Sequence, residues 1–208
     1  MQIKKYEDMN LIALDVMKEI GSIGTGNAAT ALSQVLSKEV KMSLPEVAIQ
    51  GYNETIKKLG NPEEIVAAVL VRMSGEIKGM MLFILKLDFI NAVIGEVLKE
   101  KVNDYSQLSV IELSALEEIG NIIISSYINA MSKLTDVSIS LSVPDTAVNM
   151  LGGILSVPMA EFGYMTDKLM FIDGKFFVDG KELKSHLLLM PDIDSLNFLL
   201  EKLGVNNG

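Results

Sequence analysis

The most regular pattern of apolar and polar positions lies between Ser109 and Pro144. At about 100° per residue, one side of a helix collects a narrow polar stripe, which consists of Ser114, Glu118, Asn121 and Ser125. The rest of the circumference is apolar, so most of this helix should be packed, and its polar stripe should face water or a partner. Ser109, followed three residues later by Glu112, is typical of a capping box and marks the helix start.

The same stretch occurs a second time, 99 positions earlier in the chain. In that first copy the stripe positions are Asp15, Glu19, Ser22 and Gly26. Many other residues are identical in this ungapped register, including Ile12/Ile111, Gly21/Gly120, Ser33/Ser132, Ser43/Ser142 and Pro45/Pro144. So many identities in one register indicate an internal duplication.

Each copy predicts a helix, three strands and a closing helix. In the first copy we expect a helix over residues 10–38 interrupted near Gly24 and Gly26, strands over 40–49, 65–73 and 77–85, and a helix that Asp88 caps. Residues 51–64 form a polar stretch with a turn. In the second copy we expect strands over 137–143, 168–178 and 183–190 and a helix over 192–203. A kink is expected at Asp173 and Gly174, and Asp179 and Gly180 indicate a hairpin turn. Residues 150–166 are expected to be irregular, without an equal in the first copy, and to form a partner or regulatory surface or to close the core.

The predicted fold class is therefore α+β, in one domain over residues 1–208 that contains two repeats, about 10–100 and 109–204. Three antiparallel strands make a poor domain alone. Two copies side by side could form one longer sheet with helices covering it.

Composition excludes several classes of function. A net charge of −9 argues against nucleic-acid binding, because phosphate backbones require a basic surface. No apolar run reaches the roughly 18 residues needed to span a bilayer, and no signal peptide is visible. The chain has no cysteine, which fits a cytoplasmic location, and its single histidine, His186, is expected to be structural or on the surface. Multi-histidine metal sites and Ser-His triads are thus poor candidates.

The polar stripes are the best candidates for chemistry. A carboxylate and an amide one helical turn apart provide neither a nucleophile nor a complete metal site. An amide can, however, orient a water molecule by accepting one of its protons. That suits hydrolysis of an already reactive bond, where catalysis is mainly positioning. The alternative is an ordinary solvated helix face, with Pro45 and Pro144 as strand-edge or turn residues.

The segment from Gly24 to Ala29 superficially matches a dinucleotide-binding fingerprint. That motif needs a preceding strand and a helix that starts at the glycines. Here the glycines lie inside a helical segment without a strand before it, which favours close helix packing or a kink.

Glu118 and Asn121, with Ser114 before them and Pro144 after them, resemble the motif of the CheC/CheX/FliY family of chemotaxis phosphatases. The family pattern is Asp or Ser, three residues, Glu, two residues, Asn, then twenty-two residues and Pro, and the second copy fits every term. The resemblance covers nearly the whole chain, and its two repeats without an additional domain are most like the CheC branch.

The resemblance implies an antiparallel sheet with long helices on it, in which the two repeats are related by a pseudo-two-fold axis. It also implies a phosphatase that hydrolyses the aspartyl phosphate of phosphorylated CheY. It implies that Asn121 orients the attacking water, that Glu118 pairs with a lysine of the regulator, and that Ser114, Asp15, Pro144 and Pro45 support the two sites. The Mg²⁺ would belong to CheY, so the chain would need no cofactor of its own. The implied partners are phosphorylated CheY, the receptor deamidase CheD, and the flagellar switch or receptor complex.

The first copy departs from the family pattern at one position, because Ser22 stands in place of the asparagine. Glu19 is retained, so the sequence predicts two docking surfaces but one efficient catalytic site. Two other functions stay open. One is a non-catalytic binding module like the middle domain of flagellar switch proteins, and the other is a small-molecule enzyme that uses the glycine-rich segment.

Overall fold

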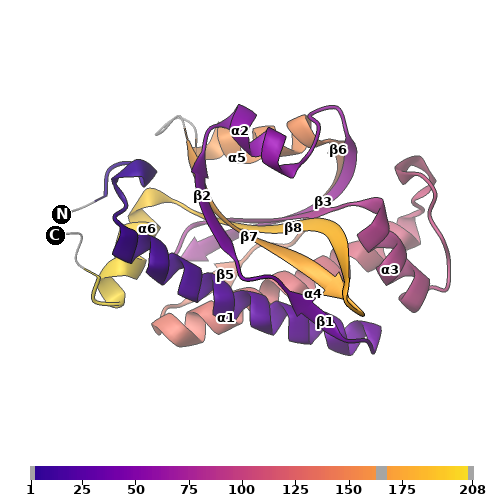
Figure 1. Ribbon diagram of the computed structural model, residues 1–208, viewed down its shortest axis with the longest axis horizontal. Coiled ribbons are helices and arrows are strands. Elements are labelled where there is room, and N and C mark those ends of the chain that lie inside the picture. Colours follow the sequence, from indigo (N-terminus) through magenta and orange to yellow (C-terminus); the bar gives the residue numbers. More distant parts are fainter. Residues whose placement is uncertain (1–2, 163–167, 206–208) are drawn as a thin grey trace.

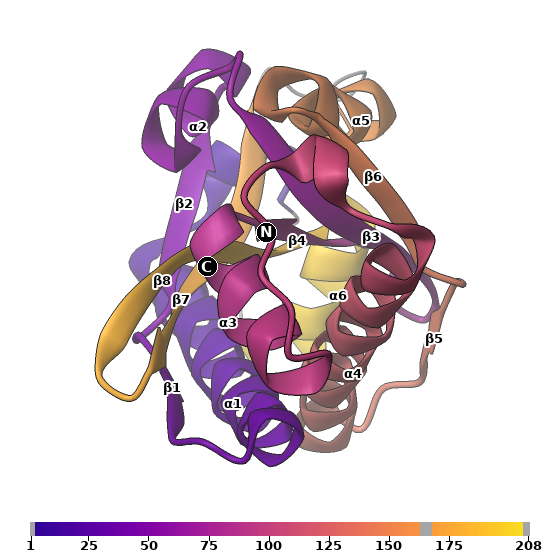
Figure 2. The same cartoon turned by 90° about the vertical axis from the view of Figure 1, so that its right-hand side faces the viewer.

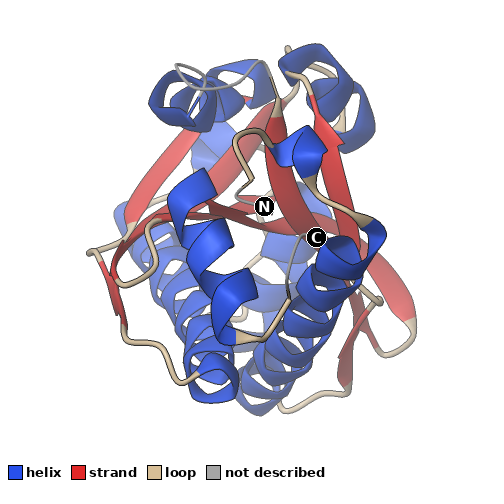
Figure 3. Cartoon of the chain, turned by 90° about the vertical axis from the view of Figure 1, so that its left-hand side faces the viewer, coloured by secondary structure: helices blue, strands red, loops and turns tan. Residues whose placement is uncertain are grey.

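The chain folds around one curled antiparallel sheet with helices on both faces (Figure 1). The computed structural model describes residues 3–162 and 168–205. Helices α1 (Leu11–Leu36) and α4 (Val110–Thr135) lie side by side on one face, and α2 (Tyr52–Leu59) and α5 (Leu151–Phe162) lie on the other. Viewed from one end, the sheet runs between these two helical layers (Figure 3). The α+β class with flanking long helices is confirmed.

Local interactions define both ends of the two long helices. The Asn10 side chain accepts a hydrogen bond from the Ala13 amide at 2.8 Å, and Ser109 forms the expected capping box with Glu112. Each helix has 26 residues. The C-cap residue of each helix, Ser37 or Asp136, has the left-handed backbone conformation with a φ of 51°. Two recurring serines complete these ends, because Ser33 and Ser132 donate to backbone carbonyls five residues further on. Identical residues in the two copies thus perform the same capping task.

The expected interruption of the first helix near Gly24 and Gly26 is wrong, since α1 is continuous. A β-carbon built on Gly24 would lie 2.5 Å from the ring of Tyr127 on α4. The glycine therefore lets the two helices approach closely. Packing against α4 stabilises helical geometry that the local propensity of glycine disfavours.

The strand expected at residues 40–49 is in fact two short strands. The strand expected at 137–143 is one short strand, and a second one that was not expected follows it. These are β1 (Val40–Met42) and β2 (Glu46–Gln50) in the first copy, and β5 (Ile139–Leu141) and β6 (Asp145–Met150) in the second. Pro45 and Pro144 stand at the breaks, where a residue without an amide hydrogen interrupts strand pairing. The recurring Ser43 and Ser142 bridge them by bonding with the facing backbone. Each repeat therefore has four strands rather than three.

Two hairpins form the centre of the sheet. They are β3 (Ile65–Gly75) with β4 (Gly79–Leu85), and β7 (Leu169–Val178) with β8 (Lys181–Pro191). The second hairpin turns at Asp179 and Gly180, which have φ values of 50° and 79°. This is the expected tight turn with two left-handed residues. Its β7 strand carries a register shift between Gly174 and Phe176, near the expected kink.

The repeats exchange their short strands. Strands β1 and β2 of the first repeat pair with β7 of the second, and β5 and β6 of the second repeat pair with β3 of the first. Strands β4 and β8 pair in the middle, which gives the order β1-β7-β8-β4-β3-β5 with β2 on β7 and β6 on β3. The expected longer sheet therefore exists, and each hairpin is completed by the other repeat.

Two predicted loops contain helices instead. Helix α2 lies within the polar stretch 51–64, and α5 occupies most of the stretch expected to be irregular, of which residues 163–166 lie outside the described ranges. The expectation that residues 150–166 lack a counterpart is also wrong, because α2 follows β2 as α5 follows β6. The Tyr52 hydroxyl donates to the Gly152 carbonyl at 2.7 Å and joins the two helices. The sequence did not indicate helix α5 because it contains Gly152, Gly153 and Pro158, which have low helix propensity.

Helices α3 (Leu87–Val97) and α6 (Ile193–Lys202) close the ends of the sheet. The N-cap of α3 is Lys86 rather than the expected Asp88, which lies in the first turn. Asp192 caps α6 by accepting from the Ser195 amide at 2.7 Å. Short 3-10 turns, Tyr6–Asp8 and Tyr105–Gln107, precede the two long helices.

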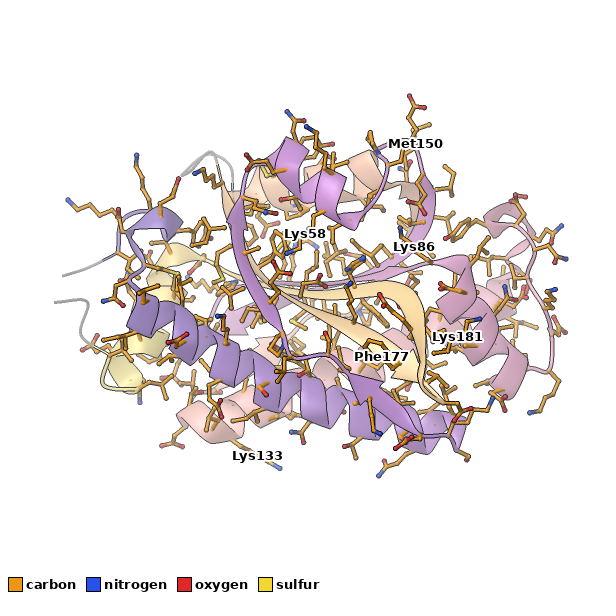
Figure 4. All side chains as sticks on the ribbon, viewed as in Figure 1. Lys58, Lys86, Lys133, Met150, Phe177 and Lys181 are labelled. Atoms are coloured by element: carbon orange, nitrogen blue, oxygen red, sulfur yellow. The ribbon has the colours of Figure 1, made fainter. Side chains whose placement is uncertain are left out.

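Apolar side chains fill both faces of the sheet. The larger core lies beneath α1 and α4, where three phenylalanine rings pack with centroids 5.0 to 5.4 Å apart. The smaller core lies beneath α2 and α5. Figure 4 shows this separation, with Lys133 pointing away from α4 on one side and Met150 on the opposite side beside α2 and α5. Because the buried side chains of α1 and α4 pack in the larger core, neither helix can turn about its own axis.

Candidate active site

The polar stripe of α4 faces outward. Ser114 and Glu118 are exposed, and Asn121 and Ser125 are half-buried. The opposite side of the helix is buried in the larger core. Glu118 therefore stands free at the surface, while Asn121 lies closer to the body of the protein. Within residues 3–162 and 168–205, no hydrogen bond or ion pair engages the Glu118 carboxylate.

A glycine fixes which face of each helix points outward. A β-carbon on Gly120 would lie 2.9 Å from a methyl of Val69 on β3. In α1, a β-carbon on Gly21 would lie 2.7 Å from Ile172 and 3.0 Å from Pro45. Each helix backbone thus rests on the sheet on the side that faces away from the stripe. Any larger residue would push the helix away and tilt the stripe.

The Asn121 amide is held by the next turn of its own helix. The Ser125 hydroxyl donates to Asn121 Oδ1 at 3.4 Å. That bond orients the amide plane and leaves the Nδ2 hydrogens and the second lone pair of Oδ1 for a ligand. Ser125 was placed on the stripe by its position in the sequence, but its contact with Asn121 is visible only in the structure.

A second contact anchors α4 beside Pro144. The Thr146 hydroxyl on β6 donates to the Glu117 carboxylate at 2.8 Å. Pro144 itself is half-buried and is the last residue of the connection between β5 and β6. The proline and this bond hold the β5–β6 connection against the helix that carries Glu118 and Asn121.

The first stripe has the same placement on α1, which lies against α4 (Figure 2). Asp15 and Glu19 are exposed and Ser22 is half-buried. Asp15 lies 3.9 Å from Lys18 Nζ, and Pro45 is buried beneath the helix. Gly26 occupies the place of Ser125, so the first stripe has neither the amide nor a hydroxyl that could orient one.

Apolar residues at the starts of both helices are exposed, although the pattern predicted a packed circumference around the stripe. Ile111 is 69% exposed and its counterpart Ile12 is 62% exposed. Their exposure could have been expected from the sequence, because the same residue occurs at this position in both copies. This recurrence indicates that they belong to the same surface as the stripes.

His186 lies away from both stripes, under α2. Its Nδ1 is 3.1 Å from both carboxylate oxygens of the buried Asp173. The pair lines a cavity of about 280 Å³ together with Lys58 and Lys86. Figure 4 shows these two lysines between α2 and the sheet. The lysines that line this cavity are paired with carboxylates: Lys58 with Glu46 at 2.7 Å, Lys86 with Glu64 at 3.0 Å and Lys175 with Glu182 at 3.3 Å. His186 thus serves a structural pair, as expected.

The glycine-rich segment provides no nucleotide site. Gly24 is buried against Tyr127 in the middle of α1, whereas phosphate binding requires the free amides of a helix N-terminus. Among the residues that the structure describes, no group of three or more His, Asp or Glu side chains could hold a metal ion. None of the helices in the same residues is long and apolar enough to cross a membrane.

Comparisons with known proteins agree with this architecture. The model of the CheC-like family matches the chain twice, at residues 12–49 and 111–148, which are the two stripe-bearing segments. The chain is 30% identical over 197 residues to the CheY-P phosphatase CheC of Bacillus subtilis. That alignment covers 93% of this chain and 94% of the relative.

Solved structures share the fold at lower identity. Thermotoga maritima FliY superposes with a TM-score of 0.70 at 19% identity, over 95% of this chain and 99% of FliY. The FliM middle domain of Helicobacter pylori superposes with a TM-score of 0.64 at 13% identity, over 93% and 99% of the two chains. The extent of the match to the Bacillus relative, and the two matches to the family model, show that this chain belongs to the CheC-like family of chemotaxis proteins.

Proposed function

We propose that this protein hydrolyses the aspartyl phosphate of phosphorylated CheY at the α4 stripe. The observation that carries the proposal is the outward Glu118–Asn121 pair in a chain whose Bacillus relative is a CheY-P phosphatase. Homology supports a phosphatase in chemotaxis, and the roles of individual residues are our inference.

In the proposed mechanism the chain contributes positioning rather than a nucleophile. Asn121 orients the attacking water in line with phosphorus, with its amide plane set by Ser125. Glu118 pairs with a lysine beside the phospho-aspartate and fixes the docking geometry. Phosphoryl transfer from a reactive acyl phosphate needs little more than such orientation, because the bond is already activated. The Mg²⁺ would reside on CheY.

Charge favours the same partner. The chain has a net charge of −9, and Glu118 reaches the surface without a partner among the described residues. A partner with a cationic group beside its phosphorylated aspartate would gain a charge-assisted hydrogen bond with Glu118. Complementary charge of this kind raises the rate of encounter and fixes the register of docking.

Substitution of Asn121 tests the proposal. We expect Asn121→Ala to lower the rate of phosphate release from phosphorylated CheY on the order of 10²-fold, because one positioning group is lost. The side chain is only half-buried, so the fold should survive, which circular dichroism and thermal unfolding will check. Near-normal phosphate release by this variant would refute the proposed site.

A second candidate is a non-catalytic module of the flagellar-switch type. The likeness to FliY and FliM favours it, although at 19% and 13% identity that likeness concerns the fold alone. This candidate predicts that the chain binds CheY without accelerating phosphate release, so the same assay separates the two functions.

We also propose CheD as a partner, with the exposed side of α5 as its docking surface. Val157 is 39% exposed there, and Glu161 is exposed on the same helix. A calorimetric titration of CheD into the wild type and into Val157→Glu tests this surface. Equal affinities would count against it.

A further inference from the structure

The charged cavity under α2 lies on the face of the sheet opposite to α1 and α4. Its charged lining residues are Glu46, Lys58, Lys86, Asp173, Lys175, Glu182 and His186. These charges are sorted by depth. The side chains of Asp173, His186, Lys86 and Lys58 are 4–21% exposed, whereas those of Lys175, Glu182 and Glu46 are 49–67% exposed. The two carboxylates of the rim are therefore solvated, and the interior holds two lysines and a histidine against one aspartate.

The other half of the sheet shows that the fold does not need an aspartate at position 173. Glu46 on β2 pairs with Asp173 on β7. In the same way Asp145 on β6, which lies 99 positions after Glu46, pairs with Leu70 on β3. Leu70 therefore holds the place of Asp173, and it is buried in the smaller core.

His186 has an apolar counterpart as well. It precedes by two residues the β8 partner of Asp173, and Met80 precedes by two residues the β4 partner of Leu70. Met80 is fully buried in the smaller core. Burial of charged groups costs free energy, and apolar side chains of similar size often replace a buried pair without loss of stability. Because one half of the sheet folds with a leucine and a methionine here, the charges in the other half indicate a task besides folding.

The two interior lysines have hydrogen-bond donors to spare. Lys58 Nζ is out of contact with solvent and, apart from its ion pair with Glu46, has no hydrogen-bond partner among the described residues. Lys86 Nζ donates to the Leu59 carbonyl at 3.1 Å and to Glu64 at 3.0 Å, which uses two of its three hydrogens. A buried ammonium group with unused hydrogens favours an acceptor that carries negative charge.

The histidine adds a further donor to this set. Nδ1 of His186 lies 3.1 Å from both oxygens of Asp173. An ionised carboxylate only accepts hydrogen bonds, so Nδ1 donates and the ring is held in one orientation. Nε2 becomes a second donor when the ring is protonated. An oxyanion in the cavity would accept from this ring and from both lysines, and its charge would offset theirs.

We propose that this cavity binds a small oxyanion with two negative charges, of the size of phosphate or sulfate. The volume of about 280 Å³ is smaller than the roughly 300–1,000 Å³ of sites for drug-sized ligands, so the ligand has few heavy atoms. The site is independent of the proposed function, because it lies on the other face of the sheet from the α4 stripe.

Calorimetric titration of the full chain tests the proposal. Inorganic phosphate and sulfate are titrated separately, with acetate as the singly charged comparison. We expect saturable binding of at least one dianion at a ratio of one per chain, at least tenfold tighter than acetate. No saturable binding of either dianion to the wild type, or acetate binding of equal affinity, would overturn the proposal.

Two lysine variants and a matched control locate the site. Lys58→Met and Lys86→Met should each lower the affinity for the dianion roughly tenfold or more, because a hydrogen bond to a charged group is lost. Glu46 is largely exposed, so the loss of Lys58 leaves no buried carboxylate behind. The control is Lys41→Met, whose ammonium pairs with Glu39 outside the cavity at 2.8 Å, and its affinity should be that of the wild type. Equal affinities for Lys58→Met and the wild type would refute the site.

The double variant Asp173→Leu with His186→Met tests whether the charges serve the fold, because it copies Leu70 and Met80 into the cavity. In a buffer without either dianion we expect cooperative urea unfolding with at least the stability of the wild type. Its affinity for the dianion should be at least tenfold lower, since the imidazole is lost. A loss of cooperative unfolding would show that the pair is needed for folding and would refute the comparison between the two halves on which the proposal rests.

Discussion

At the scale of single residues, the α4 site depends on a side chain that the family motif does not include. Ser125 lies one turn beyond Asn121 and donates to its Oδ1 at 3.4 Å. An asparagine amide can turn about its last side-chain bond, and one internal hydrogen bond limits that rotation. We therefore regard Ser125 as a positioning residue of the proposed reaction.

We expect Ser125→Ala to lower kcat for phosphate release about two- to tenfold, since a single hydrogen bond contributes roughly 0.5–1.5 kcal/mol. KM for phosphorylated CheY should stay unchanged, because the proposed docking contact of Glu118 is retained. Ser125→Thr should recover most of the rate by restoring the hydroxyl. The matched control is Ser126→Ala, one residue further round the helix, which should leave kcat unaltered. Equal rates for Ser125→Ala and the wild type would remove the positioning role.

At the scale of elements, the contact between α1 and α4 decides how the two stripes are held. Gly24 meets the ring of Tyr127, which is buried in the larger core. Burial raises the pKa of the Tyr127 hydroxyl, which has no hydrogen-bond partner among the described residues. The ring fills the space that the missing side chain of the glycine leaves. The two helices are therefore held together here by van der Waals packing and not by a hydrogen bond.

Two glycines of the same helix turn allow a matched test of this packing. Gly24→Ala should lower the free energy of unfolding by about 1–3 kcal/mol, because its methyl would overlap the Tyr127 ring. Gly26→Ala should raise it by roughly 0.5–1 kcal/mol, since nothing lies within 4 Å of its β-carbon and alanine favours the helix. Urea unfolding measures both. The packing argument is wrong if the two variants change stability in the same direction.

At the scale of the whole molecule, neither repeat has a complete sheet of its own. The first repeat supplies β1 and β2 to the hairpin of the second, and the second supplies β5 and β6 to the hairpin of the first. Helices α1 and α4 then pack against each other. Separation of the repeats would expose both long helices and both hairpin edges.

We expect the fragments 1–104 and 105–208 to lack cooperative unfolding as isolated monomers, because each has lost the strands that complete its hairpin. An equimolar mixture should recover the circular dichroism spectrum of the intact chain and a cooperative thermal transition. A monomeric fragment that unfolds as cooperatively as the intact chain would show that one repeat is sufficient.

Much of this arrangement follows from local sequence. The outward stripes, the caps at Asn10 and Ser109 and the turn at Asp179 all depend on residues within a few positions of one another. The duplication spans 99 positions, but it is visible as repeated residues in the sequence alone. Helix periodicity, capping and turn conformation are set by such short-range contacts, which a sequence displays directly. Glu118 and Asn121 could be selected as candidates for the same reason.

Only the tertiary structure decided the features that depend on distant partners. Gly24 continues a helix because Tyr127 packs against it, and α5 forms despite two glycines and a proline because Tyr52 and the sheet hold it. The exchange of strands between repeats has no local signature. Long-range packing can outweigh the weak propensities of single residues, so these features emerged only when the chain was folded.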